Sequence, residues 1–230
     1  MDSGKAKKML AAHPKMVRWG LKILNHGSWK NTLRASGVTL REGACLLRGV
    51  RIESRGMDNV VEIRDFARLR NCVIHIEGSH NHLVIGEYDC LEGVEFWMED
   101  DGNQICLGAH TAIHSGTQLA AIEGTKITFG DGCLVSNEVR IRTGDSHSIL
   151  DAEEKRINPS RDVVLEEKVW LGNRTMCLKG SYVSRDSIVA AGAVVTKAFH
   201  EPGCILAGLP AKVVKQGIHW DAQRVAVEKM

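Results

Sequence analysis

One histidine stands in a polar stretch that interrupts an otherwise regular sequence. His147 lies in the run Arg-Thr-Gly-Asp-Ser-His-Ser-Ile that begins at Arg142, and a polar stretch at 151–162 follows. Its imidazole can accept and return a proton near neutral pH. Asp145, two residues earlier, could orient that ring or stabilise its charged form. His147 is therefore a candidate general base, and the alternative is a loop histidine bonded to local backbone.

The residues after this interruption repeat with a period of six. An aliphatic or cysteine side chain recurs without a gap in Leu165, Leu171, Cys177, Val183, Val189 and Val195. Small or β-branched residues stand four positions after each of the first five, in Val169, Thr175, Ser181, Ser187 and Ala193. Positions six apart fall on different faces of an α-helix. In a coil with three flat sides each hexad forms one side, so the repeat predicts a parallel β-helix.

The same register is present upstream in a less regular form. It holds in 107–119 and in 129–141, and the two blocks are out of phase because 120–128 intervenes. Before residue 100, short runs alternate apolar and polar residues as half-buried strands do, and glycines punctuate them. We therefore expect an all-β fold whose first coils are irregular.

Composition restricts the function classes. The chain has 230 residues, a net charge of +2 and 5% aromatic residues, which suits one solenoid with a narrow core. So small a net charge favours neither nucleic acid nor an anionic membrane as a partner. Seven cysteines without metal-like pairs indicate buried thiols in a reducing compartment. No apolar run approaches the roughly 20 residues of a membrane span, and no signal peptide is apparent, so we expect a cytoplasmic protein.

The sequence divides into three parts. Residues 1–44 form a cap that is helical, basic and apolar; it covers the open first coil, with peripheral membrane contact as the alternative. Residues 45–204 form the β-helix, with a catalytic loop at about 142–162. Residues 205–230 form a C-terminal segment that we expect to be a short helix packed on the solenoid or on a neighbouring subunit.

Several stretches around the interruption resemble one known family. They are the run from Arg142, Arg-Ile-Asn-Pro at 156–159, and Val-Trp-Leu-Gly-Asn at 169–173. The runs Ala-Ala-Gly-Ala-Val-Val-Thr-Lys at 190–197 and Ala-Gly-Leu-Pro-Ala-Lys at 207–212 extend the likeness. Together they resemble the hexapeptide-repeat acetyltransferases, and among these the branch that O-acetylates bacterial capsular and other surface polysaccharides.

This resemblance implies a left-handed parallel β-helix, usually a homotrimer, with acetyl-CoA bound in the groove between adjacent subunits. It maps the catalytic histidine onto His147. Trp170 matches a tryptophan that lines the site in similar enzymes, where it would donate to the oxyanion or shape the acetyl pocket; the alternative is a ring that only packs between subunits. The positions that match cofactor contacts are Asn173, Ala191, Thr196, Lys197, Lys212 and Lys215.

The sequence thus predicts an acetyl-CoA-dependent O-acetyltransferase acting on a saccharide hydroxyl in surface polysaccharide biosynthesis, with His147 as general base. An N-acetyltransferase for a nucleotide-linked amino sugar would share the scaffold, and a solenoid that only binds or scaffolds is a third class. Other histidines offer a metal site between subunits, as in the gamma-class carbonic anhydrases; they are His75, His80, His82, His110 and His114. The predicted mechanism requires no metal.

Overall fold

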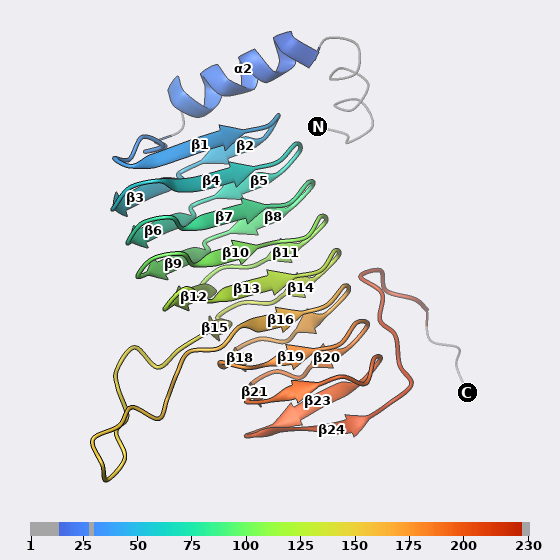
Figure 1. The fold of residues 1–230 in the computed structure, drawn as a ribbon. Helices are drawn as coiled ribbons and strands as arrows, with labels where there is room; N and C mark the ends of the chain where they lie inside the picture. Colours follow the sequence, from blue (N-terminus) through green and yellow to red (C-terminus); the bar gives the residue numbers. More distant parts are fainter. Residues whose placement is uncertain (1–13, 28–29, 227–230) are drawn as a thin grey trace.

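The computed structural model describes residues 14–27 and 30–226 and consists of a parallel β-helix with one α-helix, α2 (Pro14–Gly27), at its end (Figure 1). Each coil contributes one strand to each of three sheets, here named A, B and C. Within a coil the chain passes from sheet B to sheet C to sheet A, and the three corners are named B–C, C–A and A–B after the sheets they join. The fold class predicted from the hexads is confirmed.

The sheets run the length of the solenoid. Sheet A contains β3 (Arg51–Arg55), β6 (Val73–Glu77), β9 (Glu95–Glu99), β12 (Gln118–Ile122), β15 (Arg140–Arg142), β18 (Met176–Cys177) and β21 (Val194–Val195). Sheet B contains β1 (Val38–Glu42), β4 (Asn59–Ile63), β7 (His82–Ile85), β10 (Gln104–Cys106), β13 (Lys126–Phe129), β16 (Val163–Leu165), β19 (Tyr182–Val183) and β22 (Ala198–Phe199). Sheet C contains β2 (Leu46–Arg48), β5 (Arg68–Arg70), β8 (Cys90–Glu92), β11 (Ala112–Ile113), β14 (Leu134–Val135), β17 (Trp170–Leu171), β20 (Ile188–Val189), β23 (Ile205–Gly208) and β24 (Ala211–Lys215).

The hexad positions form the core of the last coils. All six predicted inward residues, from Leu165 to Val195, are at most 1% exposed, and the small residues four positions later are buried beside them. Cys133 and Cys177 point inward as small apolar side chains, and burial raises the pKa of both thiols to about 12. The interior is thus a single column of aliphatic side chains that the two-residue strands can line.

Coil length differs between the two ends of the solenoid. In the first coils a residue pairs with one twenty-two positions later, as Val60 does with His82. In the last coils the interval is eighteen, as between Trp170 and Ile188. Most of the extra length lies in the five-residue strands of sheet A and in the turn that follows them. Because eighteen residues make three hexads, the period of six is clear only in the last coils.

A ladder of buried side chains supports the A–B corner of the long coils. The backbone N–H of Asn81 donates to Oδ1 of Asn59 at 2.9 Å, and that of Asn103 donates to Oδ1 of Asn81 at 2.8 Å. Thr125 continues the ladder, because its N–H donates to Asn103 at 3.2 Å and its hydroxyl donates to Thr143 at 2.6 Å. The ladder therefore ends on the residue at which the long loop begins.

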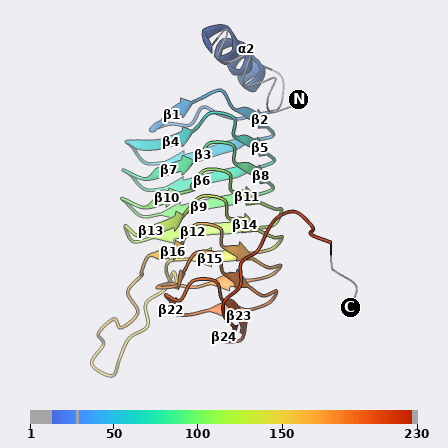
Figure 2. The same cartoon turned by 90° about the vertical axis from the view of Figure 1, so that its right-hand side faces the viewer.

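The two ends of the chain differ from the expected boundaries. Strands begin at Val38, inside the segment expected to be the cap, of which residues 1–13 lie outside the described residues. At the other end β24 pairs antiparallel with β23. The predicted C-terminal helix is wrong for the described residues, since 216–226 has no regular structure. This segment climbs the outside of the solenoid in Figure 2, with the Ile218 N–H bonded to the Gly203 carbonyl at 2.9 Å.

Candidate functional site

The loop 143–162 leaves the solenoid at the A–B corner, between β15 and β16 (Figures 1 and 2). Its base is closed by two backbone hydrogen bonds: Thr143 N–H to the Ala120 carbonyl at 3.1 Å, and Arg161 N–H to the Thr143 carbonyl at 2.8 Å. Thr143 is fully buried. The loop therefore starts from a rigid point on the scaffold, as functional loops commonly do.

The side-chain amide of Asn158 holds the loop together. Its Nδ2 donates to the His147 carbonyl at 2.8 Å and to Asp145 Oδ2 at 2.9 Å. Its Oδ1 accepts from the Ile149 N–H at 2.8 Å and from Arg156 Nε at 3.2 Å. Asn158 is 5% exposed, so these bonds are shielded from water. The backbone of the predicted catalytic histidine is thus fixed on both sides.

Asp145 does not contact the imidazole that it was expected to orient. Its carboxylate forms an ion pair with Lys179, from the turn after β18, and accepts from Asn158. These two partners hold the pKa of Asp145 below its usual range. The carboxylate therefore ties the loop to the next coil and positions His147 through Asn158.

The imidazole of His147 is free to meet another molecule. The residue is exposed, and in the part of the chain that the structure describes no hydrogen bond or ion pair engages its ring. Only its carbonyl oxygen is taken up, by Asn158. A loop whose backbone is fixed while its one imidazole stays open is suited to proton transfer.

The other predicted site residues lie on two different corners. Asn173 and Ala191 are exposed in successive turns of the C–A corner, where the Gly192 N–H donates to the Asn173 carbonyl at 2.8 Å. Trp170 lies beside them on sheet C, and its indole N–H donates to Ser136 Oγ at 3.4 Å. The width of sheet A separates these residues from the loop of the same chain.

Thr196 and Lys197 lie exposed at the A–B corner, below the loop, and the Lys197 ammonium sits 5.4 Å from the centre of the Phe199 ring. Lys212 and Lys215 are exposed on β24 at the end of sheet C. The predicted site residues therefore form two groups at opposite edges of sheet A, plus two lysines at the end of the solenoid.

Comparisons with known proteins agree with this architecture. A polysialic acid O-acetyltransferase of Neisseria meningitidis is 31% identical over 166 residues, which cover 72% of this chain and 76% of that protein. The chain belongs to the hexapeptide-repeat acyltransferases. A polysialic acid O-acetyltransferase of Escherichia coli O1:K1 / APEC is 30% identical over 120 residues, but the match spans only 38% of its length. No family model matches the chain.

Two solved structures show how far the likeness to these acyltransferases extends. The polySia-specific acetyltransferase NeuO superposes with a TM-score of 0.77 at 26% identity, over 86% of this chain and 84% of that one. The polysialic acid O-acetyltransferase OatWY superposes with a TM-score of 0.74 at 26% identity, over 85% and 92%. The likeness therefore includes the irregular first coils, which the sequence motifs did not reach.

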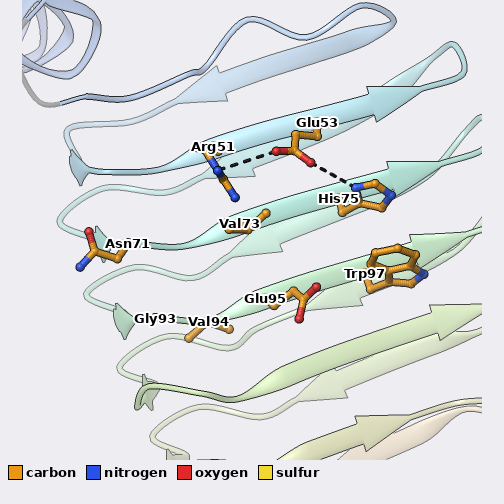
Figure 3. Close-up of a pocket in the computed structure, with 9 residues that line it drawn as sticks. All are labelled: Arg51, Glu53, Asn71, Val73, His75, Gly93, Val94, Glu95 and Trp97. Atoms are coloured by element: carbon orange, nitrogen blue, oxygen red, sulfur yellow. Dashed lines mark hydrogen bonds and ion pairs between the residues drawn. The ribbon is translucent and has the colours of Figure 1, made fainter.

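A hollow of about 370 Å³ lies on sheet A, away from the His147 loop and toward the α2 end of this acyltransferase (Figure 3). The His75 ring stacks on Trp97 with centroids 4.1 Å apart, and its nitrogens face Glu53 at 3.5 Å and Glu77 at 3.2 Å. Both nitrogens of the His75 ring thus face carboxylates, whereas the described residues give the His147 ring no hydrogen-bond or ion-pair partner. Within residues 14–27 and 30–226, no three side chains are grouped to hold a metal ion.

Sequence reasoning missed two residues of the acyltransferase loop. Asn158 lies in the motif Arg-Ile-Asn-Pro, but the sequence predicted no role for it. No predicted site residue or motif includes Lys179. Their partners lie 13 and 34 residues away in sequence, so no local pattern joins them. The repeat itself could have indicated Lys179, because this residue lies in the next A–B turn after the loop.

Proposed function

We propose that this acyltransferase transfers an acetyl group from acetyl-CoA to a hydroxyl of a saccharide, in the biosynthesis of a surface polysaccharide. The observation that carries the proposal is the exposed, unengaged imidazole of His147 on a loop fixed by Asn158. The relative from Neisseria meningitidis is a polysialic acid O-acetyltransferase, which favours a polysaccharide acceptor over a small molecule.

His147 acts as general base in the proposed reaction. A sugar hydroxyl is a weak nucleophile at neutral pH, so the imidazole takes its proton as the oxygen attacks the thioester carbon. The resulting tetrahedral oxyanion collapses and the carbon–sulfur bond breaks. The leaving thiolate then recovers the proton from the imidazolium, which returns His147 to its starting state.

The tetrahedral oxyanion needs a hydrogen-bond donor where water is scarce. Trp170 lies on sheet C beside the C–A corner that carries Asn173 and Ala191, here called the cofactor corner. Its indole N–H is 3.4 Å from Ser136 Oγ, a long bond that a developing charge can replace. Trp220 from the C-terminal segment packs against Trp170 with centroids 5.8 Å apart. The two indole rings would line the acetyl pocket and exclude water from it.

The proposed site is shared between two copies of the chain in a homotrimer. His147 and the cofactor residues Asn173 and Ala191 lie at opposite edges of sheet A, so one chain alone does not bring them together. The loop also presents three exposed apolar side chains, Ile149, Leu150 and Ile157, each about half exposed. Such a patch favours contact with a second chain, and a cyclic trimer would satisfy every copy of that contact.

Lys212 and Lys215 are the proposed contacts for the phosphates of acetyl-CoA. Both lysines are exposed on β24, two strands of sheet C below β20, the strand that precedes Ala191. Replacing both with Ala should raise the KM for acetyl-CoA more at low than at high salt and leave kcat largely unchanged. A KM that does not change at low salt would place the phosphates elsewhere.

Thiol release from acetyl-CoA against a panel of glycans tests the proposed reaction. Wild-type protein should release thiol with at least one polysaccharide, and His147→Ala should reduce turnover by about 10²–10⁴-fold, the usual contribution of a positioned base. Thermal unfolding should be unaffected, because the ring lies outside the core. Turnover within a few-fold of wild type would remove His147 from the mechanism.

A further inference from the structure

The charge of this chain is strongly polarised along its length. Residues 1–70 contain fifteen Lys and Arg against six Asp and Glu, a net charge of +9, while residues 71–230 contain fifteen against twenty-two, a net charge of −7. The described part of the first segment is α2 together with the coil strands from β1 to β5, which lie at one end of the solenoid (Figure 1). Within 14–27 and 30–70, the described part, twelve Lys and Arg stand against five Asp and Glu, so the overall charge of +2 conceals a basic end.

The helix α2 is attached to this end mainly through polar contacts. Arg18 forms an ion pair with Asp65 at 2.6 Å, and His26 forms one with Glu42 at 2.8 Å. The side-chain amide of Asn25, which is 2% exposed, donates to a backbone carbonyl just before β2 and accepts from a backbone N–H within β2. Among the described residues, the hydrophobic core of the solenoid includes no side chain of α2.

α2 carries apolar side chains on two sides: Val17 and Leu21 are half-buried, and a second apolar stripe is exposed. Met16, Trp19 and Ile23 are spaced three and four residues apart, so they share one face of the helix, and they are 60%, 68% and 49% exposed. Val17 and Leu21 are enough for a helix that covers the open first coil, so that role does not account for the outer stripe. The orientation indicates that the stripe has a partner outside the chain.

Cations accompany the exposed stripe. Lys15 and Lys22 are exposed on α2, and the helix from Pro14 to Gly27 contains no Asp or Glu. An amphipathic helix with Trp on one face, Lys and Arg on the other, and low overall hydrophobicity is the pattern that lies in the surface of a lipid bilayer. Within the described residues no helix is long and apolar enough to cross a membrane.

We propose that α2 and the basic first coils dock the protein on the surface of an anionic lipid bilayer, with Met16, Trp19 and Ile23 at the boundary of headgroups and acyl chains. Two other occupants fit less well. A soluble polyanion would be held by the arginines and would leave the apolar stripe exposed. A second copy would bring two ends of like charge together, which is unfavourable.

This docking would orient the solenoid with its axis away from the membrane. Five coil steps of about 4.8 Å separate β1 from β16, which places the end of the His147 loop at β16 roughly 24 Å along the axis from β1, with α2 beyond β1 (Figure 1). The inference stands on α2 and the charge distribution alone. For the proposed function it adds that the acceptor is modified close to a membrane surface.

Vesicle flotation tests the proposal with the full chain. We expect it to float with vesicles of phosphatidylcholine and phosphatidylglycerol, to stay behind with phosphatidylcholine alone, and to be released by high salt. The double variant Trp19→Ser/Ile23→Ser should bind the anionic vesicles about tenfold less or weaker still, since binding scales with the buried apolar area. Leu209→Ser is the matched control, because Leu209 is 76% exposed at the opposite end of the solenoid, between β23 and β24, and it should bind like wild type.

Each contrary result has a definite meaning. Wild-type protein that does not float with anionic vesicles, or a Trp19→Ser/Ile23→Ser variant that floats as well as wild type, would overturn the proposal. Binding to soluble dextran sulfate that is equal in both proteins, without flotation, would assign the end to a polyanion. Self-association lost in the double variant, without flotation, would assign it to a second copy. Thiol release measured without vesicles keeps the proposed activity separate, because that readout needs no membrane.

Discussion

The coils before and after the loop 143–162 are built to different lengths, and the loop stands where they meet. Before it, a coil takes twenty-two residues and the strands of sheet A have five residues, as in β9. After it, a coil takes eighteen residues and the same strands have two, as in β18. The extra residues of the long coils lie on the side from which the loop leaves. The comparison indicates that the loop is an enlarged A–B turn, supported from above by the long coils and anchored below by a short one.

The two regions should respond differently to cavities of similar cost. Phe96→Ala in the long coils should lower the free energy of unfolding by about 3–5 kcal/mol, and Leu171→Ala in the short coils by about 2–5 kcal/mol. Phe96 lies three coils above Asn173, so its variant should keep the wild-type KM for acetyl-CoA when folded. Leu171 adjoins Trp170, so its variant should also change KM or kcat. Chemical denaturation and steady-state kinetics on both variants measure this.

If both variants lost activity equally at a temperature where both are folded, the long coils would affect the site as much as the short coils do, which would contradict the expected difference between the two regions. It would mean that the long coils transmit strain into the site. The comparison of the two regions would then be one of length only.

Two buried asparagines allow a closer test of the difference between the loop and the long coils. Asn158 fixes the loop, and Asn103 belongs to the ladder of the long coils; both are at most 5% exposed. Replacing either with Ala leaves buried backbone groups unpaired, at a cost of about 1–3 kcal/mol. Only Asn158→Ala should reduce kcat, by about tenfold or more, since misplacing a catalytic group is costly. Its KM should change little, and equal kcat values in the two variants would show that Asn158 does not position His147.

A smaller effect concerns pH. Burial raises the pKa of Asp89, in the turn before β8, to about 7 despite N–H donors from Gly86 and Thr111. The folded state therefore holds this proton more tightly than the unfolded chain, in which the pKa is about 3.8. The contribution of Asp89 to stability is fully present below about pH 4 and is lost as pH rises through about 7.

The lower region should show the opposite sign. Hydrogen bonds from Ser184 and Tyr182 hold the pKa of Glu166 below its usual value. The contribution of Glu166 is therefore present at neutral pH and lost under acid conditions. Melting temperatures of Asp89→Asn and Glu166→Gln between pH 3 and pH 8 check this. In Asp89→Asn the melting temperature should fall less toward pH 8 than it does in the wild type. In Glu166→Gln it should fall less toward pH 3. Parallel profiles in all three proteins would remove both assignments.

The sequence was informative where the fold is simplest. The hexads from Leu165 to Val195 predicted the core of the short coils, because each inward position recurs at a fixed interval. The repeat length of the long coils was not predicted, because it is twenty-two residues and does not follow the period of six. Asn59, Asn81 and Asn103 recur at that interval and could have revealed it. The C-terminal helix was wrong because Ile218 and Trp220 alternate along an extended segment on the solenoid.

The candidate site was predictable in its residues and not in its arrangement. His147 was indicated by its residue type and its place in the interruption. Its support by Asn158 and Lys179 depends on which turns stack, which follows only from the register of the coils. The separation of His147 from Asn173 across sheet A likewise required the three-sheet topology.

The central claim is that two chains complete one site, and mixed assemblies test it most directly. His147→Ala removes the base, and Ala191→Trp blocks the exposed cofactor corner with a large ring. Each variant alone should be nearly inactive in thiol release. Coexpressed in equal amounts, they should regain about a quarter of wild-type activity, because in a cyclic assembly one interface in four then pairs an intact His147 with an intact corner. Activity no greater than that of the two variants measured separately would contradict the shared site.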